Sequence, residues 1–242
     1  TEKVLLAEEF QVNLQICKKE LHQSWQALEM GFSAFADAPA SFSDFVLAHV
    51  SAKVADRIEK NIWSGANATS GQFDGLSVLL AADADLPAGQ EIAAIGGGIL
   101  PANVIAEMGK VVDAIPTAVY GKEDLLLYVA PNVARAYVRA LGGFGANGLG
   151  ANGIEAQGTT WYTNGALSFD GISVVVAQGM PASSMMAAQK SNLFFATGLL
   201  NDTNEVQVID MAPLDGSRNV RVVMRFTAAV AIGISSDVVL YA

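Results

Sequence analysis

The sequence is poor in charge. Charged side chains make up 16% of its 242 residues, well below the roughly 25% of an ordinary soluble domain, while apolar residues make up 52%. No stretch approaches the ~20 uninterrupted apolar residues that a membrane-spanning helix needs, so we expect no membrane association. We predict instead that part of the apolar surface is covered by other molecules, most simply by further copies of the same chain.

Residues that build reactive sites are also scarce. The single cysteine, Cys17, excludes an intrachain disulfide framework, and His22 and His49 are the only histidines. Metal-ligand spacing, a GxSxG nucleophile turn and a Gly-Lys-Ser/Thr phosphate loop are all absent. Asp83 and Asp85 form a carboxylate pair that is more typical of a loop than of general acid–base catalysis. We therefore predict no catalytic residues, no cofactor and no metal, and a protein that is not an enzyme.

Positive charge is especially limited, because the net charge is −10. This balance argues against strong binding to nucleic-acid phosphates. Near the C-terminus, however, Arg218, Arg221 and Arg225 alternate with apolar residues, and Arg221 and Arg225 share a strand face. We interpret that face as solvated or as an assembly contact between subunits, with a nucleic-acid contact as the alternative. The polar first residues predict no signal peptide, and Thr1 without a methionine suggests a processed or truncated start.

The strongest pattern that is present lies at residues 43–64. Apolar residues recur there in a strict step of four, which predicts one long amphipathic helix with its apolar face against a sheet. The stripe consists of Val46, Val50, Val54, Ile58 and Ile62, widened by Leu47 and Ala55. Ser43 is expected to cap the helix, and Gly65 to end it in a left-handed conformation. At ~1.5 Å per residue the helix would be roughly 30 Å long.

The remaining elements give β structure at both ends and α/β alternation between them. We predict strands at 3–17, 76–82, 124–130, 172–177, 205–211, 219–227 and 231–241, and helices at 18–29, 101–115 and 131–141. Asp170–Gly171 and Asp215–Gly216 read as tight turns. The simplest topology pairs the two ends of the chain in one sheet under the long helix, with residues 77–190 as an inserted lobe.

Residues 142–158 form the region of lowest complexity, GGFGANGLGANGIEAQG. A dinucleotide-type GxGxxG occurs twice, and its glycines include Gly145, Gly148, Gly150 and Gly153. The dinucleotide mechanism needs a strand before the glycines and a helix after them, whereas here a helix precedes them. We therefore interpret the four glycines as an assembly loop at a symmetry axis, where backbones crowd. An α/β enzyme that binds a phosphorylated ligand at this loop is the less favoured alternative.

The order of parts resembles the major capsid protein of tailed phages. The resemblance rests on the long helix, the glycine-rich turn SGANATSGQFDGL and the strand-then-helix segment YVAPNVARAYVRALGG, followed by QKSNLFFATGLLNDTNEVQVIDM and NVRVVMRFTAAVAIGISSDVVLY. The last two segments are similar to capsid proteins of phages that infect Bacteroidetes-type hosts. The resemblance implies an α+β fold with a peripheral β-sheet, a spine helix and an inserted α/β axial domain.

In that scheme residues 1–76 are a peripheral domain with the spine helix at 43–64, residues 77–190 are the axial domain, and residues 191–242 return to the peripheral domain. The implied function is a structural shell subunit that self-assembles into hexamers and pentamers of an icosahedral virion around double-stranded DNA, without tight sequence-specific binding. Assembly would take place in the host cytoplasm, with portal, scaffold and decoration proteins as further partners. An encapsulin-like protein compartment is the alternative. The family's N-terminal arm and extended loop are not recognised in the residues before 43. Because crosslinking in the family uses a lysine on that loop, no crosslinking residue is expected here.

Overall fold

The structure is a computed structural model that describes residues 3, 5, 7–17, 40–141, 167–198, 206–217 and 219–242. The chain divides into two compact units, which are described separately below. Unit 1 consists of Thr1–Lys3, Glu59–Phe194 and Val230–Ala242, and unit 2 of Val4–Ile58 and Phe195–Ala229. Both units therefore combine segments that are far apart in the sequence.

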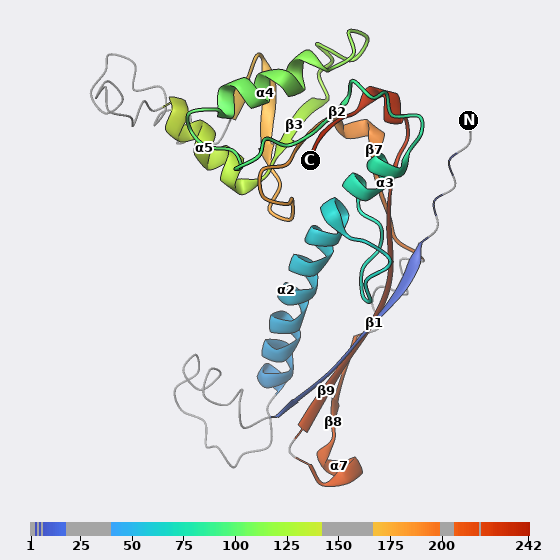
Figure 1. The fold of residues 1–242 in the computed structure, drawn as a ribbon. Helices are drawn as coiled ribbons and strands as arrows, with labels where there is room; N and C mark the ends of the chain where they lie inside the picture. Colours follow the sequence, from blue (N-terminus) through green and yellow to red (C-terminus); the bar gives the residue numbers. More distant parts are fainter. Residues whose placement is uncertain are drawn as a thin grey trace. The chain divides into compact units, whose positions relative to one another are not determined.

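Unit 2 contains most of the long helix and a sheet built from both ends of the chain (Figure 1). The helix α2 spans Ala40–Ser64, so the predicted helix is confirmed. It begins ahead of Ser43, which lies within its first turn and is not its cap. The sheet has the order β1-β9-β7, with β8 also paired to β9. Its strands are β1 (Glu8–Cys17), β7 (Leu193–Ala196), β8 (Val206–Asp210) and β9 (Asn219–Ile232).

The core of unit 2 forms where the helical step of four meets the alternation of the strands. Val46 and Val50 of α2 pack against Val220 and Val222 of β9 in one buried cluster. Partly buried apolar residues surround the cluster, among them Val12, Ile16, Val54, Val208 and Met224. The predicted stripe is thus correct at its centre, but Ala55 is exposed and does not widen it.

The β8–β9 pair confirms the predicted hairpin, although its turn is longer than the Asp215–Gly216 signal suggested. A short helix, α7 (Ala212–Asp215), connects the strands, and Gly216 ends that helix at φ 69°. β9 is a single strand that runs through residues 228–230, which the sequence had assigned to a break. β1 and β9 pair antiparallel from Glu8 with Ala228 to Cys17 with Asn219.

Unit 1 is a six-stranded mixed sheet with helices packed on it (Figure 1). The strand order is β2-β10-β6-β3-β5-β4. The strands are β2 (Glu91–Ile92), β3 (Leu125–Val129), β4 (Leu167–Phe169), β5 (Ile172–Val176), β6 (Met185–Gln189) and β10 (Val239–Tyr241). The helices are α3 (Leu76–Ala82), α4 (Val104–Asp113) and α5 (Pro131–Leu141), with 3₁₀ turns at Lys190–Asn192 and Ser235–Asp237. α4 packs against α5, β6 and β10.

Three sequence predictions are wrong in unit 1. Residues 76–82 form the helix α3 and not a strand. α4 begins at Val104, because Pro101 lies in the turn before it. The C-terminal strand β10 pairs with β2 and β6 and not with the N-terminal strand. The predicted strands at 124–130 and 172–177 and the helix at 131–141 are confirmed. The predicted helix at 18–29 lies outside the described residues.

Candidate functional surfaces

The face of β9 that carries Arg221 and Arg225 points away from the α2 core. Val220 and Val222 fill that core, and residues two and four apart on a strand share a face, so the two arginines lie together on the other side. Gln15 and Gln11 of β1 stand opposite Arg221 and Arg225. Arg221 Nη2 donates to Gln15 Oε1 at 3.2 Å. The structure thus gives this part of the sheet a polar, basic outer face, and its assembly role stays a prediction.

The glycine-rich assembly loop with Gly145, Gly148, Gly150 and Gly153 lies outside the described residues, as does Arg218. Of the histidines, His22 lies there too, whereas His49 is an exposed residue of α2. The His49 ring stacks on Phe45 one turn away, with ring centroids 6.4 Å apart. His49 is therefore a surface residue of the helix.

The Asp83–Asp85 pair is a structural anchor. Asp83 Oδ2 accepts hydrogen bonds from Lys3 Nζ at 2.6 Å and from Ser235 Oγ at 2.5 Å, and its Oδ1 accepts one from the Asp85 backbone N–H. These bonds, those of Lys3 and Ser235 foremost, lower the pKa of Asp83 to about 2. A carboxylate held ionised by three donors joins loops of unit 1 and is poorly suited to exchange protons near neutral pH.

A buried carboxylate that sequence reasoning missed lies on the buried side of α4. Glu107 is buried, accepts two hydrogen bonds from Lys110 Nζ at 2.8 and 2.9 Å, and accepts a third from Tyr241 Oη at 2.8 Å. Tyr241 Oη in turn accepts a hydrogen bond from the Ile95 backbone N–H. The Lys110 bonds lower the pKa of Glu107 against the opposing effect of burial, and burial raises the pKa of Tyr241. This cluster ties α4 to the C-terminal strand.

A second polar clamp holds a strained backbone beside a cavity. Ser183 has φ 64°, which a non-glycine residue rarely adopts. Asn132, the second residue of α5, fixes it: its Oδ1 accepts from Ser183 N at 3.0 Å and its Nδ2 donates to Ser183 Oγ at 3.1 Å. The Ile99 backbone N–H also donates to that hydroxyl. The strain is therefore balanced by three hydrogen bonds.

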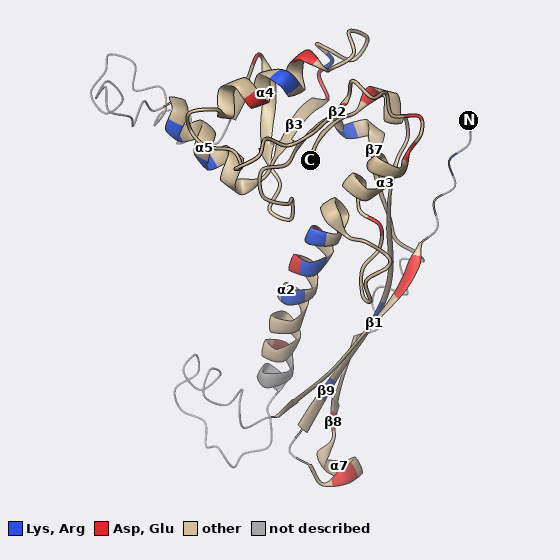
Figure 2. Ribbon diagram, viewed as in Figure 1, with Lys and Arg blue, Asp and Glu red and all other residues tan. Residues whose placement is uncertain are grey.

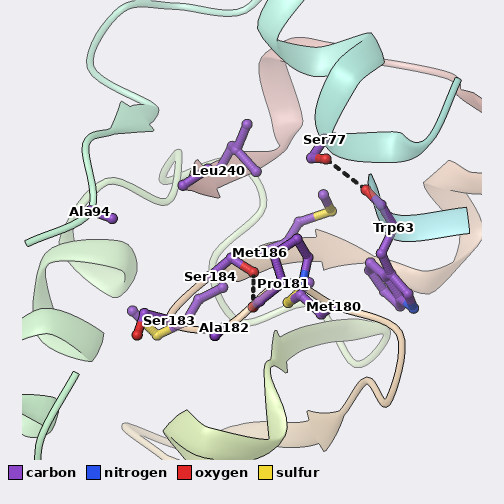
Figure 3. Close-up of a pocket in the computed structure, with 12 residues that line it drawn as sticks. Trp63, Ser77, Ala94, Met180, Pro181, Ala182, Ser183, Ser184, Met186 and Leu240 are labelled. Carbon is purple, nitrogen blue, oxygen red and sulfur yellow. Dashed lines mark hydrogen bonds between the residues drawn. The ribbon is translucent and has the colours of Figure 1, made fainter. Parts of the chain in front are cut away.

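The cavity next to Ser183 measures about 140 Å³ and is mostly apolar (Figure 3). Trp63, Met180, Met186 and Leu240 are among the residues that line it. The hydroxyls of Ser77 and Ser184 point to backbone carbonyls, of Trp63 and Pro181 respectively. The cavity therefore offers mainly apolar surface. We interpret it as a space left by imperfect packing beside methionines, the flexible side chains that commonly occupy irregular parts of a core.

Neither a metal site nor a membrane-spanning helix is found in the part of the chain that the structure describes. No group of three or more His, Cys, Asp and Glu side chains there could hold a metal ion. No helix there is both long and apolar enough to cross a bilayer. The polar clusters around Asp83, Glu107 and Asn132 each connect segments of unit 1 that are distant in the sequence.

The long helix with its sheet, the inserted α/β sheet and the returning strands define a class of fold, that of tailed-phage capsid proteins. Solved structures with this fold match nearly the whole chain. A chain of the satellite phage P4 procapsid, solved including the size determination (Sid) protein, is 13% identical with a TM-score of 0.58, and the match covers 97% of this chain and 75% of that chain.

Two further structures show how widely this fold is used. The capsid of the native GTA particle is 13% identical with a TM-score of 0.58, over 98% of this chain and 72% of that chain. The holo-SrpI encapsulin complex from Synechococcus elongatus PCC 7942 is 8% identical with a TM-score of 0.53, over 98% and 73%. No protein-family model and no curated protein matches the sequence. At these identities the similarity establishes the α+β capsid fold.

Proposed function

We propose that the chain is a major capsid protein, a structural subunit that self-assembles into hexamers and pentamers of an icosahedral phage shell around double-stranded DNA. The observation that carries the proposal is the match of its fold, over 97–98% of the chain, to the procapsid of satellite phage P4 and to the GTA capsid. Its place would be the virion, after assembly in the host cytoplasm, and its role would be structural, without turnover.

The composition supports the same role. Apolar side chains are exposed on several elements of both units, including Leu14, Ile105, Phe194, Phe195 and Leu214. Surface of this kind is expected on a subunit whose edges are buried in permanent contacts. A net charge of −10 suits a container that encloses DNA without binding its phosphates tightly. Portal, scaffold and decoration proteins would be the further partners.

The domain assignment belongs to this proposal. Residues 1–76 would form the peripheral domain with α2 as its spine, residues 77–190 the axial domain, and residues 191–242 the return. The glycines Gly145, Gly148, Gly150 and Gly153 would lie near the capsomer axis, and Arg221 and Arg225 on a face between subunits.

Electron microscopy of the purified full-length product, with nuclease digestion of its contents, tests the proposal. Closed icosahedral particles that protect double-stranded DNA in infected cells support a phage capsid. Particles that hold only protein would favour an encapsulin-like compartment, which the match to the SrpI encapsulin makes the second candidate. A protein that stays monomeric at high concentration, with or without a scaffold, would refute both.

A further inference from the structure

Unit 1 has an open groove with a basic rim on α5. The groove measures about 450 Å³ and lies between α5 and the strands β4 and β5. We call it the α5 groove, and the residues that define it are Ala134, Arg135, Val138, Arg139, Leu167 and Val176. Tyr137 fixes its shape, because its hydroxyl donates to the Ser168 carbonyl at 2.7 Å and its ring meets Phe169 edge-on.

The groove combines an apolar floor with positive charge. The apolar side chain of Val176 is 38% exposed. Arg135 and Arg139 are both exposed as well. Neither arginine forms an ion pair with a described residue, and α5 contains no acidic residue at all. Arginine over an apolar pocket is a common anchor site at protein interfaces.

The opposite chemistry lies on a separate patch of the same unit. The connection after α4 presents Tyr120, which is 51% exposed, and the exposed carboxylate of Glu123. Two further exposed carboxylates belong with them, Asp113 at the end of α4 and Asp170 in the turn between β4 and β5. We call these four residues the acidic ridge. Tyr120 Oη donates to the Asp170 carbonyl at 3.5 Å, which joins the two segments of the ridge. The nearby cations are engaged elsewhere: Lys110 binds Glu107 and Lys122 donates to Gln189.

The backbone that carries Tyr120 is held in one conformation by burial and hydrogen bonds. Val119 is fully buried beside Tyr120, and the turn continues through Gly121 at φ 86°. The backbone N–H groups of Val119 and Tyr120 both donate to the Pro116 carbonyl. An aromatic side chain on a fixed turn loses little conformational freedom on binding, which favours its use as an interface anchor.

We infer that the acidic ridge of one copy binds in the α5 groove of the next copy, with Tyr120 on the apolar floor and the ridge carboxylates against Arg135 and Arg139. In Figure 2 the red segments at the end of α4 and in the connection after it are separate from the blue bands on α5. A contact between unlike patches of two copies is heterologous, and its repetition forms a ring when the rotation between copies closes, as a capsomer requires. The inference rests on the proposed function and specifies one contact within the capsomer.

Charge reversal on the full-length protein tests this contact. We expect Arg135→Glu with Arg139→Glu to raise the protein concentration needed for half-maximal assembly about tenfold or more, because like charges would then face each other. Asp113→Lys with Glu123→Lys should do the same from the other side, and the fourfold variant should assemble again. Lys53→Glu with Arg57→Glu on the exposed side of α2 is the control of equal charge change and should assemble as the wild type does.

Each other outcome is decisive. If the wild type assembles and the groove variant assembles equally well, the contact is wrong while the capsid proposal stands; if the wild type never assembles, the capsid proposal itself fails. Equal loss in the control would assign the effect to net charge and overturn the contact. If the groove variant assembles normally but is less heat-stable as a monomer, the groove is filled by its own chain. If the groove variant assembles but its particles lose nucleic acid, the groove binds nucleic acid. Either result would overturn the contact between copies.

Discussion

Two glycines in the turn between α2 and α3 are expected to tolerate no side chain. The chain crosses itself there, and the Gly75 backbone N–H donates to the Gly65 carbonyl at 2.9 Å. A Cβ on Gly65 would lie 2.2 Å from the Phe73 carbonyl oxygen, and one on Gly75 would lie 2.5 Å from the Asn61 carbonyl oxygen. Gly65 does not have the positive φ that the sequence predicted, so close approach is what requires glycine here.

The cost follows from the geometry. A carbon and a carbonyl oxygen normally approach no closer than about 3.3 Å, so Gly65→Ala must move two backbone segments apart by about 1 Å. Overpacking in a packed region costs about 1–3 kcal/mol, occasionally more, and backbone neighbours cannot rotate away. We therefore expect a loss of about 3 kcal/mol for either variant. For a chain of this size that corresponds to a fall in melting temperature of about 6–12 °C.

Thermal and urea unfolding of dilute, unassembled subunit, followed by tryptophan fluorescence, measures this loss, because Trp63 is buried beside the turn. Gly109→Ala in α4 is the matched control. A Cβ at Gly109 meets no atom within 4 Å, and alanine favours the helix by up to about 1 kcal/mol over glycine, so this variant should be slightly more stable than the wild type. Wild-type stability of Gly65→Ala, or an equal loss in Gly109→Ala, would refute the reasoning.

Three further predictions concern the core of unit 2, buried Glu107 and partly buried Asp83. Val50→Asp places an unpaired charge in the unit 2 core and should abolish soluble subunit, whereas Lys53→Asp on the exposed side should not; normal yield of Val50→Asp would show that the face is wrongly assigned. Tyr241→Phe removes a donor to buried Glu107 and should cost about 1–3 kcal/mol in urea unfolding; an unchanged midpoint would contradict this role. Because folding lowers the pKa of Asp83 from 3.8 to about 2, its contribution is full above the unfolded value and is lost as pH falls toward about 2. Asp83→Asn should therefore weaken the decline in stability over that window, and parallel pH profiles would argue against it.

The sequence was most informative where one period extended over many residues. The step of four in α2 and the alternation in β9 each identify one buried face, and the core around Val50 and Val222 confirms both. The shared face of Arg221 and Arg225 follows from the same alternation and is confirmed by the strand register. Their proposed role in assembly depends on contacts between subunits, and the structure of a single chain does not test such contacts.

Short apolar segments were misassigned because tertiary contacts decide them. Residues 76–82 read LSVLLAA, which fits a strand or a helix equally well. The helix α3 forms because Leu76 and Leu80, one turn apart, are both buried. The Leu79 N–H also donates a hydrogen bond to the Gly75 carbonyl. β6 was missed for a similar reason: MMAAQ has no alternation, and all five residues are buried between β10 and β3.

The buried polar clusters could not be foreseen at all, because their partners are distant in sequence. Nothing around Glu107 indicates burial, and its partner Tyr241 lies on the last strand. Asn132 and Ser183 likewise meet only through the fold. The one available signal was Asn132 directly after Pro131 at the start of a predicted helix, where a polar side chain often contacts a neighbouring backbone.

The low charge content makes the distribution of the remaining charges informative. In unit 1 several charged groups serve internal contacts: Lys3 with Asp83, Lys110 with Glu107, and Asp124, which accepts from Gln189 and Ser191. Each of these contacts joins segments or stabilises one helix and needs no second molecule. Arg135 Nε donates to the Pro131 carbonyl within α5 at 3.2 Å, but neither α5 arginine and none of the carboxylates of the acidic ridge forms an ion pair among the described residues. Since a chain with so few charges carries these in two separate patches of one unit, beside exposed Val176 and exposed Tyr120, their most direct use is to select and orient a neighbouring copy.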